Sequence, residues 1–298
     1  MTAARAGARS YTDLTSAETA GALGGHTLVW PIGATEQHGP HLPLSVDSVL
    51  AEEFGRAIAE ELDGFVLPVQ PVAARSLPQS GGGLSFPGTL HVHGDTLVRF
   101  LREALLSVAE LPCARLLVVN GHFENEPFIF EALDQVCRDG AFDDKEVLAF
   151  SWWSLVQESW LRAELPEFPG WHAEHAGVTE TSLMLHLRPD LVREARPGHD
   201  RPPRSGIYLH PIDVAQTTNE GVLSSTQGSS AALGEKLFRH VVAEAVALVR
   251  SGEGLLLART RPDRRRNGTA AAAPTATHAV PTAAVPTAAV TTEGTETP

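Results

Sequence analysis

Short apolar runs and helical patterns alternate through the middle of the chain. The apolar runs have the length of buried strands and fall at residues 26–31, 65–69, 115–119 and 147–150. Apolar residues at helical spacing predict helices at 48–62, 98–108, 153–163, 178–188 and 230–250. A further helix is expected to begin at the NGHFEN segment and to end near residue 138. Asp95 is expected to cap the second of these helices. The alternation predicts an α/β fold with a mainly parallel sheet and helices on both faces.

The two ends of the chain differ from this middle part. Residues 1–10 are small and polar, and we expect a flexible arm there. Residues 262–298 form an Ala/Pro/Thr-rich tail with a crude PTAAV repeat. Such a composition cannot offset the entropy of ordering, so the tail is expected to be disordered. Residues 11–255 contain no visible linker, which predicts one domain followed by the tail.

Composition narrows the picture mainly by what it excludes. The net charge of −13 disfavours nucleic acid as a partner, because a phosphate backbone attracts Lys and Arg. No apolar run reaches 18 residues and the N-terminus has no apolar signal core, so neither a membrane span nor secretion is expected. Cys113 and Cys137 form no disulfide framework or zinc-finger pattern, which fits free thiols in the cytoplasm.

The loop after the first predicted strand carries a group of candidate metal ligands. The segment EQHGPHLPLSVD contains Glu36, His38, His41 and Asp47. Carboxylate oxygens and imidazole nitrogens suit zinc, manganese and related divalent ions. Glu36 and His38 are two residues apart and point to one side of an extended stretch, and Asp47 could return to bridge two ions. The same residues also fit a polar loop in which Asp47 is a helix N-cap.

A second polar group follows the predicted strand at 115–119. In VVNGHFEN, His122 and Glu124 are again two residues apart. Alone, this segment fits a turn with Glu124 as an ordinary first-turn acid equally well. The carboxyl ends of parallel strands meet at one edge of a sheet, where ligands bind. This topology brings the second group to the first one and favours a metal site.

The third polar group is GWHAEHAGVTETS, which contains Trp171, His172, Glu174, His175 and Glu180. A histidine there has an ordinary pKa near working pH and can transfer protons. In the alternative interpretation His172 is a solvated loop residue, and Glu174 and His175 are a hydrogen-bonded pair that supports a turn. Glu180 fits either a group that orients a ligand or a helix-start acid.

Other motifs carry less chemistry. The Gly-rich stretch at 80–88 lacks both common phosphate-binding patterns and is interpreted as a tight loop that lets backbone approach a ligand. No GxSxG elbow is present and neither cysteine has a neighbouring histidine motif, so nucleophilic serine or cysteine catalysis has little support. Four tryptophans fit either core packing or a wall over a small flat substrate: Trp152, Trp153, Trp160 and Trp171.

Taken together, these motifs resemble the creatininase (creatinine amidohydrolase) family over roughly residues 15–252. The matching segments are PIGATEQHGPHLPLSVD (31–47), SGGGLSFPGT (80–89), VNGHFEN (119–125), GWHAEHAGVTETSLML (170–185) and GVLSST (221–226). The resemblance implies a three-layer α/β/α single domain, usually hexameric, with two divalent metal ions, for which zinc and manganese are expected. By the family pattern Glu36 and His122 hold one metal, His38 and Glu124 hold the other, and Asp47 bridges them.

The resemblance also assigns roles around the substrate. The expected catalytic residues are His175, as the proton shuttle, and Glu174. The residues expected to contact a small-molecule substrate are Ser80, Phe123, Trp153, Trp171 and His172. Creatininase has Tyr where this chain has Phe123, and Asp where it has His172, and both differences bear on which amide is accepted.

The expected activity is metal-dependent hydrolysis of an amide C–N bond, cyclic in the case of creatinine, which would yield creatine. In that reaction the metals would activate a water, and His175 would protonate the departing nitrogen. The alternatives within the family are the peptidase of the mycofactocin precursor and enzymes acting on formamides or on cyclic inositol-derived ketones. The alternative of a different class is a non-catalytic metal-binding scaffold.

Overall fold

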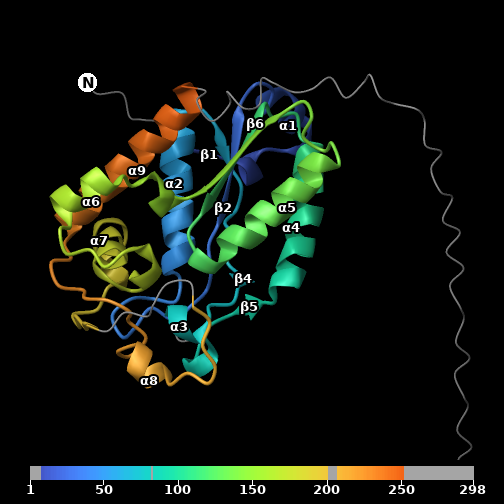
Figure 1. The fold of residues 1–298 in the computed structure, drawn as a ribbon. Coiled ribbons are helices and arrows are strands. Elements are labelled where there is room, and N and C mark those ends of the chain that lie inside the picture. Colours follow the sequence, from blue (N-terminus) through green and yellow to red (C-terminus); the bar gives the residue numbers. More distant parts are fainter. Residues whose placement is uncertain (1–7, 82, 201–206, 252–298) are drawn as a thin grey trace, which may run out of the picture. The chain divides into compact units, whose positions relative to one another are not determined.

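The computed structural model describes residues 8–81, 83–200 and 207–251, which belong to the first of two units of the chain, Met1–Leu257. A five-stranded sheet runs through this unit, and each neighbouring pair of its strands is parallel (Figure 1). In spatial order the strands are β1 (Arg9–Ser10), β3 (Phe65–Val66), β2 (Thr27–Ile32), β6 (Arg115–Asn120) and β7 (Glu146–Ser151). Two short strands, β4 (Ala73–Ala74) and β5 (His91–Val92), pair separately.

Helices cover both faces of the sheet. Helices α2, α7 and α9 lie on one side, and α4 and α5 lie on the other (Figure 1). The helix bounds are α1 (Ser16–Ala22), α2 (Val46–Glu61), α3 (Pro78–Gly81), α4 (Gly94–Ala109), α5 (Glu126–Arg138), α6 (Glu158–Glu164), α7 (Val178–Leu187), α8 (Val214–Thr217) and α9 (Ala231–Ser251). The predicted α/β fold, with a parallel sheet between helices, is therefore confirmed.

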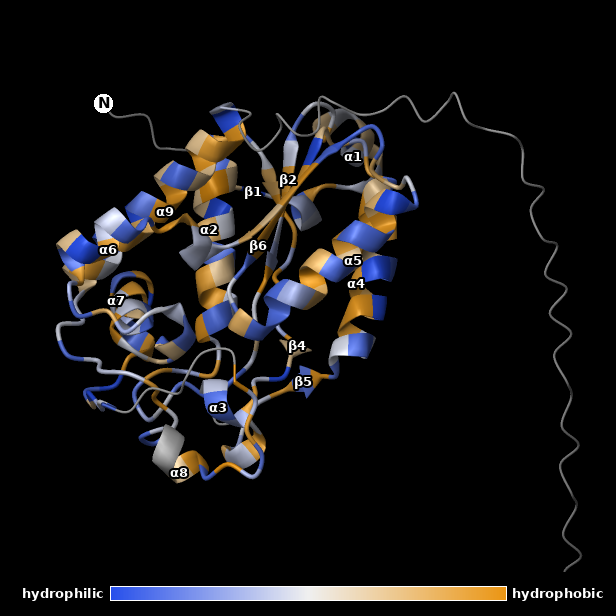
Figure 2. Cartoon of the chain, in the orientation of Figure 1, coloured by the Kyte–Doolittle hydropathy of each residue, from blue (hydrophilic) through white to orange (hydrophobic). Residues whose placement is uncertain are grey.

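The central strands are buried on both sides, which explains why they read as continuous apolar runs. Side chains alternate across β2, so Leu28 and Trp30 pack toward α4 and α5 while Val29 packs toward α2 and α9. Figure 2 shows these apolar strands between helices whose polar sides face outward. In α4, Leu101 and Leu105 lie one turn apart and are almost fully buried. Burial of each such leucine contributes about 1.5–3 kcal/mol.

Some predicted boundaries differ from the structure. Arg9 and Ser10 form β1 beside Phe65 and Val66, so this part of the expected N-terminal arm is a strand. Asp95 is not a cap, because α4 begins at Gly94 with His93 at the capping position. The expected tail at 262–298 lies outside the described residues. Within the described part of the chain, no helix combines the length and apolar character needed to cross a membrane.

Candidate metal centre and active site

The candidate site lies where the order of the strands reverses. β2 pairs with β3 on one side and with β6 on the other, with Thr27 opposite Arg115 and Ile32 opposite Asn120. Loops leaving the carboxyl ends of two such strands diverge and open a crevice. The EQH segment follows β2 and the GHFEN segment follows β6. The predicted convergence of these two polar groups is therefore present in the fold.

Asp47 reaches this crevice from helix α2. The helix begins at Val46 with Ser45 at the capping position, so Asp47 lies in the first turn and the N-cap interpretation is wrong. Its side chain is buried, with only 3% of its surface exposed. Partial positive charge at the start of a helix favours a carboxylate there. Asp47 can therefore stay ionised in a buried place.

Two clusters of ligand-type side chains meet at Asp47. In the first cluster, His122 Nδ1 lies 3.1 Å from Glu36 Oε2 and 3.0 Å from Asp47 Oδ2. In the second, His38 Nε2 lies 3.1 Å from Asp47 Oδ1 and 3.7 Å from Glu180 Oε2. His175 joins this second cluster through a ligand atom within 4.8 Å of the others. Asp47 thus presents one carboxylate oxygen to each cluster.

The hydrogen bonding of these atoms is incomplete. Both carboxylate oxygens of Glu36, Oδ2 of Asp47 and Nε2 of His38 are buried and form no hydrogen bond within the described residues. Buried polar atoms whose hydrogen bonding is unsatisfied are costly to the fold. A divalent cation between such oxygen and nitrogen donors removes that cost. The residues present fit two such ions, one on each side of Asp47.

Glu124 lies at the edge of the first cluster. Its Oε2 is 3.3 Å from His122 Nε2, and its Oε1 accepts a hydrogen bond from the Ser80 hydroxyl. Ser80 belongs to α3, so the Gly-rich loop does approach the candidate centre, as the sequence predicts. The sequence interpretation treated Glu180 as a supporting or helix-start acid, yet the structure brings Glu180 to His38.

Burial and mutual attraction shift the titration of these groups. Burial raises the pKa of Glu36 to about 8, although His122 opposes the shift. Burial lowers the pKa of His122, but the carboxylates of Glu36 and Asp47 outweigh it and raise that pKa to about 10. Burial likewise opposes ionisation of Asp47, while His38 and His122 hold its pKa well below the usual range. Without a cation, protons therefore balance the charge of this cluster.

The third polar group is split between two roles. His175 lies in the crevice, with Nε2 3.5 Å from Glu36 Oε1 and its ring 4.5 Å from the His38 ring. Burial and the neighbouring His38 lower the pKa of His175 well below its usual range. Glu174 instead accepts hydrogen bonds from the Thr179 backbone N–H (2.8 Å) and hydroxyl (2.7 Å) at the start of α7. Glu174 therefore supports the turn that carries His175.

Aromatic side chains form the wall of the crevice. Trp152 is fully buried, and Trp171 packs edge-on against it at 5.3 Å between ring centroids. Phe123 is 50% exposed and stacks on Trp153 at 6.0 Å. Together with His172 these rings line an enclosed cavity of about 30 Å³ beside Asp47 and His175. Trp152 is thus a core residue, whereas Trp153 and Trp171 form the wall, and Trp160 packs on His240.

Two polar residues near the centre had no place in the sequence predictions. Asn125 is fully buried, accepts from the Ala74 backbone N–H (2.9 Å) and donates to the Gly33 carbonyl (2.9 Å). Gln37 is also buried and contacts His175. Both stand inside the motifs: Gln37 lies between two candidate ligands, and Asn125 directly follows one. The candidate His41 lies outside both clusters, with Nε2 2.9 Å from the Thr181 hydroxyl.

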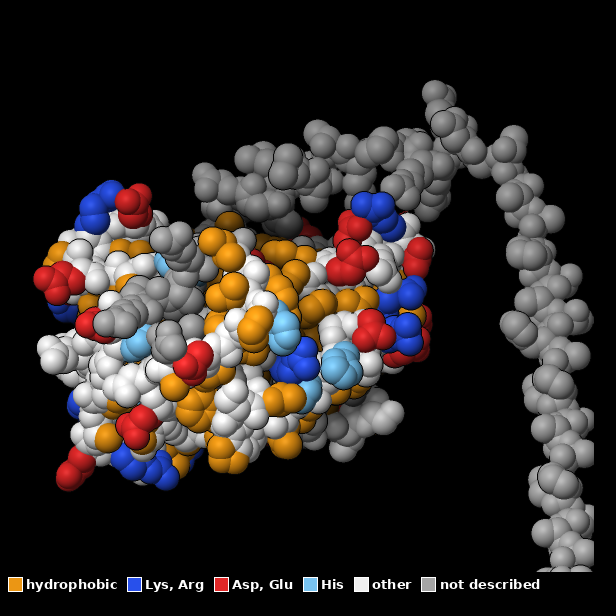
Figure 3. Space-filling view, turned by 60° about the horizontal axis from the view of Figure 1, so that its bottom comes forward, with side chains coloured by type: hydrophobic (Ala, Val, Ile, Leu, Met, Phe, Trp, Pro, Cys, Tyr) orange, Lys and Arg blue, Asp and Glu red, His pale blue; other side chains and the backbone are white. Residues whose placement is uncertain are grey.

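The face at the bottom of Figure 1 carries α3, whose Ser80 contacts Glu124. Figure 3 turns this face forward and shows a broad band of hydrophobic side chains with histidines among them. The segments around α3, β5 and α8 contribute exposed apolar residues, including Leu84, Leu90 and Ile207. The candidate centre is therefore bordered by surface of a kind that contacts other molecules.

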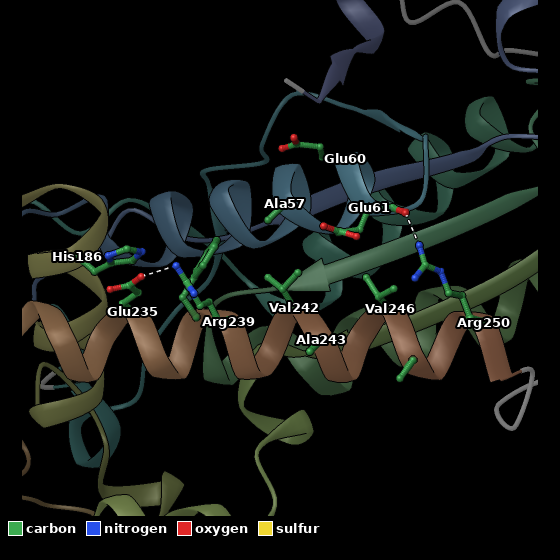
Figure 4. A pocket seen from close by; sticks show the side chains of 12 residues that line it. Ala57, Glu60, Glu61, His186, Glu235, Arg239, Val242, Ala243, Val246 and Arg250 are labelled. Atoms are coloured by element: carbon green, nitrogen blue, oxygen red, sulfur yellow. Dashed lines mark hydrogen bonds and ion pairs between the residues drawn. The ribbon is translucent and has the colours of Figure 1, made fainter. Parts of the chain in front are cut away.

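A larger cavity, of about 920 Å³, lies between α2 and α9 (Figure 4). Its apolar wall includes Val242, and two charged side chains at its rim already bind neighbouring residues. Arg250 donates to the Glu61 carbonyl (2.7 Å) and Arg239 pairs with Glu235 (2.6 Å). None of its lining residues belongs to a metal-ligating cluster within the described residues. The candidate ligands therefore lie in the smaller crevice.

Comparison with known proteins decides the family. A family model described as creatininase, creatinine amidohydrolase, matches residues 12–249. The chain belongs to the creatininase family. It is 38% identical to the creatinine amidohydrolase of Pseudomonas putida over 220 residues, which cover 72% of this chain and 85% of that one. It is also 31% identical to the mycofactocin precursor peptide peptidase of Mycobacterium ulcerans, covering 75% and 84% of the two chains.

Solved creatininase structures share the fold. One of them has a TM-score of 0.76 at 34% identity and covers 82% of this chain and 98% of its own. A manganese form is equally similar, with a TM-score of 0.76, 33% identity and coverage of 82% and 98%. A variant creatininase complexed with creatine has a TM-score of 0.75 at 33% identity, with coverage of 81% and 97%. As a creatininase-family protein, this chain is a hydrolase that acts on amide bonds.

Proposed function

We propose that the chain is a binuclear metal-dependent amidohydrolase that opens a small cyclic amide, with creatinine as the first candidate. The observation that carries this proposal is the position of Asp47, with Oδ1 facing His38 at 3.1 Å and Oδ2 facing His122 at 3.0 Å. A carboxylate shared in this way is suited to bridging two cations. The likeness to a creatinine amidohydrolase supports the choice of substrate.

The ligands divide around Asp47. Glu36 and His122 would hold one ion together with Asp47, since their ligand atoms lie within 4.8 Å of one another. His38 and Asp47 would hold the other, with a carboxylate from Glu180 or Glu124 completing the set. The geometry favours Glu180, which lies 3.7 Å from His38. When bound, zinc or manganese ions supply a water of lowered pKa and positive charge for a developing oxyanion.

His175 is placed to move the proton. Burial and His38 keep its imidazole neutral, so it can accept a proton from the attacking water. It then returns that proton to the departing nitrogen as the C–N bond breaks. With creatinine the product would be creatine, in which the former carbonyl carbon is a carboxylate and the departing nitrogen belongs to a guanidino group. Glu174 contributes by holding the turn before α7, and it forms no bond to the reacting atoms in this scheme.

The aromatic wall favours a flat substrate. Trp153, Trp171 and Phe123 offer ring faces and edges on which a planar amide can stack. Peptide hydrolysis is the second candidate, because the chain is also similar to mycofactocin precursor peptidases.

The deciding experiment uses the purified full chain loaded with Zn²⁺ or Mn²⁺. Creatine formation from creatinine is measured for the native protein, for Asp47→Asn, and for Asp95→Asn, which alters an exposed acid of α4. We expect turnover in the native protein and in Asp95→Asn, and its loss in Asp47→Asn. Cleavage of peptides instead of creatinine would favour the second candidate. A metal-loaded protein inert toward a broad amide panel would contradict both and indicate a scaffold.

A paired substitution tests substrate choice. Phe123→Tyr and His172→Asp introduce the hydroxyl and the carboxylate that creatininase has at these positions. Because the chain lacks both, we expect the double variant to raise kcat/KM for creatinine roughly tenfold or more. Unchanged kcat/KM would mean that neither side chain contacts the substrate. Light scattering on the same samples tests the hexamer that the resemblance implies.

A further inference from the structure

Gln37 stands between the two ligands of the EQH motif and is only 5% exposed. Its side-chain amide contacts two segments that are distant in sequence, the end of α3 and the turn at Gly221. Nε2 donates to the carbonyl of Gly81 (2.6 Å) and to the carbonyl of Gly221 (2.9 Å). Oε1 accepts from the backbone N–H of Gly39 (2.8 Å). The polar atoms of this buried side chain are therefore all engaged.

The imidazole of His175 meets the same residue twice. Its Nε2 lies 2.9 Å from the main-chain carbonyl of Gln37 and 2.9 Å from the Gln37 side-chain Nε2. The amide group has two hydrogens, and both are directed at the carbonyls of Gly81 and Gly221. The imidazole nitrogen must then carry a hydrogen and donate it to the Gln37 carbonyl. This hydrogen bond selects the Nε2–H tautomer.

We propose that Gln37 is the positioning residue of His175: its main chain fixes the Nε2–H tautomer, and its side-chain amide clamps the two loops that frame the ring. The same Nε2 lies 3.5 Å from Glu36 Oε1, so the contacts with Gln37 hold the ring beside a proposed ligand. The proposal rests on the proton-transfer role given to His175 above. It extends that role by naming the residue that holds the ring and sets its tautomer.

The two clamped loops come close enough only because they carry glycine. Gly221 has a φ of +89°, and a Cβ added there would lie 2.0 Å from Gln37 Oε1. A Cβ at Gly81 would lie 3.3 Å from Nε2 of the His175 ring. The second loop also holds the main chain of His175, because the Leu223 backbone N–H donates to its carbonyl (3.1 Å). Losing the amide would release both loops from the ring at once.

Displacement of the His175 ring should lower the rate of catalysis more than it weakens substrate binding. A general acid–base displaced by about 1 Å can cost roughly 100-fold in rate, while contacts to the rest of a substrate persist. Gln37→Met keeps the length of the side chain and the main-chain carbonyl but deletes both donors. For this variant we expect kcat to fall about 10- to 100-fold, with KM changed by less than about threefold and metal content unchanged.

The matched control is Gln70→Met. Gln70 is a partly buried glutamine that belongs to neither cluster. Its Nε2 donates to the Val72 carbonyl (2.7 Å). It should keep native kcat and KM. Gln37→Asn, which shortens the amide without removing it, serves as a second variant should Gln37→Met fail to fold. It is expected to lose kcat in the same direction.

A measurement independent of activity reads the tautomer directly. Nitrogen-15 NMR of histidine-labelled, metal-free protein should show His175 protonated at Nε2, and a mixture of tautomers in Gln37→Met. An Nδ1–H form in the native protein, or native kcat in both Gln37 variants, would overturn the proposal. If His175→Ala keeps full activity, the proton-transfer role fails, yet the NMR signal still reports whether Gln37 sets the tautomer.

Discussion

The main chain of Gly121 lies directly against the main chain of Asp47. A Cβ added at Gly121 would be 2.3 Å from the Asp47 carbonyl oxygen. Gly33 makes the matching approach from the end of β2, where an added Cβ would be 2.4 Å from Cα of Ser48. The first turn of α2 is thereby wedged between the ends of β2 and β6. These two contacts fix the position of Asp47 in the crevice.

Gly121→Ala should therefore disturb the candidate metal centre, although Gly121 is not itself a proposed ligand. The new methyl group meets backbone on the opposite side, so α2 or the loop after β6 must move. Overpacking of this kind costs about 1–3 kcal/mol of the free energy of unfolding. We also expect weaker binding of both ions, because Asp47 faces both clusters. Thermal unfolding with and without Zn²⁺, together with metal analysis, checks both effects.

Gly21→Ala is the control for this substitution. Gly21 lies in α1, and a Cβ there would meet nothing within 4 Å. Alanine should stabilise the helix by roughly 0.5–1 kcal/mol and leave metal binding unchanged. Equal metal affinity in Gly121→Ala and the native chain would mean that Asp47 does not depend on this contact.

Two conservative variants separate the candidates for the second ion. Glu180 lies 3.7 Å from His38, whereas Glu124 contacts His122 and Ser80. We expect Glu180→Gln to bind close to one ion per chain and to lose most activity. Glu124→Gln should keep more metal, since it stands at the edge of the first cluster. The reverse order, measured by elemental analysis of dialysed protein, would return Glu124 to the role given by the family pattern.

Metal binding should release protons at neutral pH. Burial raises the pKa of Glu36 to about 8. Burial lowers the pKa of His122, but the carboxylates of Glu36 and Asp47 outweigh it and raise this pKa to about 10. Both groups therefore carry a proton at pH 7 in the metal-free protein and must lose it to bind a cation. Affinity should rise with pH from about 6 to 8. Calorimetry in buffers of different ionisation enthalpy counts the protons, and a count near zero would contradict these shifts.

His41 should make the fold sensitive to acid. Burial, with Arg196 nearby, lowers the pKa of His41 from 6.5 to about 4. As the pH falls from 6.5 toward 4, the unfolded chain takes up this proton before the folded one does, so stability falls across that window. The loss is on the order of 1–3 kcal/mol, at the lower end where solvent screens the charge of Arg196.

His41→Gln can keep a hydrogen bond to Thr181 without this titration. Its unfolding free energy should vary less with pH between 6.5 and 4 than that of the native chain, as measured by urea unfolding. An identical slope in His41→Gln and the native chain would contradict the assignment.

The sheet and its helices could be predicted because burial on both faces leaves a plain pattern. The run at 115–119 falls within β6, and the run at 26–31 overlaps five residues of β2. The meeting of the two polar groups also follows from strand topology alone. The start of α2 at Val46 was harder, because Asp47 satisfies the preference for an acid either at the cap or in the first turn.

Contacts between distant segments could not be read from the sequence. Glu180 reaches His38 only through the position of α7 beside α2, and Gln37 gains its role from carbonyls of two remote loops. No local pattern encodes such contacts. The division of the tryptophans between core and wall has the same origin: Trp152 and Trp153 are neighbours in sequence, yet only Trp152 is fully buried.

The proposed ligands and the wall of the crevice belong to different parts of the fold. Glu36, Asp47 and His122 are held by strand ends and the first turn of α2, whereas Trp171 and His172 stand on a short turn, Trp171–Ala173, that begins after Gly170. Exchange of this turn would leave the metal-binding atoms untouched. Substitutions in this turn can therefore change which amide is accepted during evolution, while the residues that hold the proposed ligands stay the same.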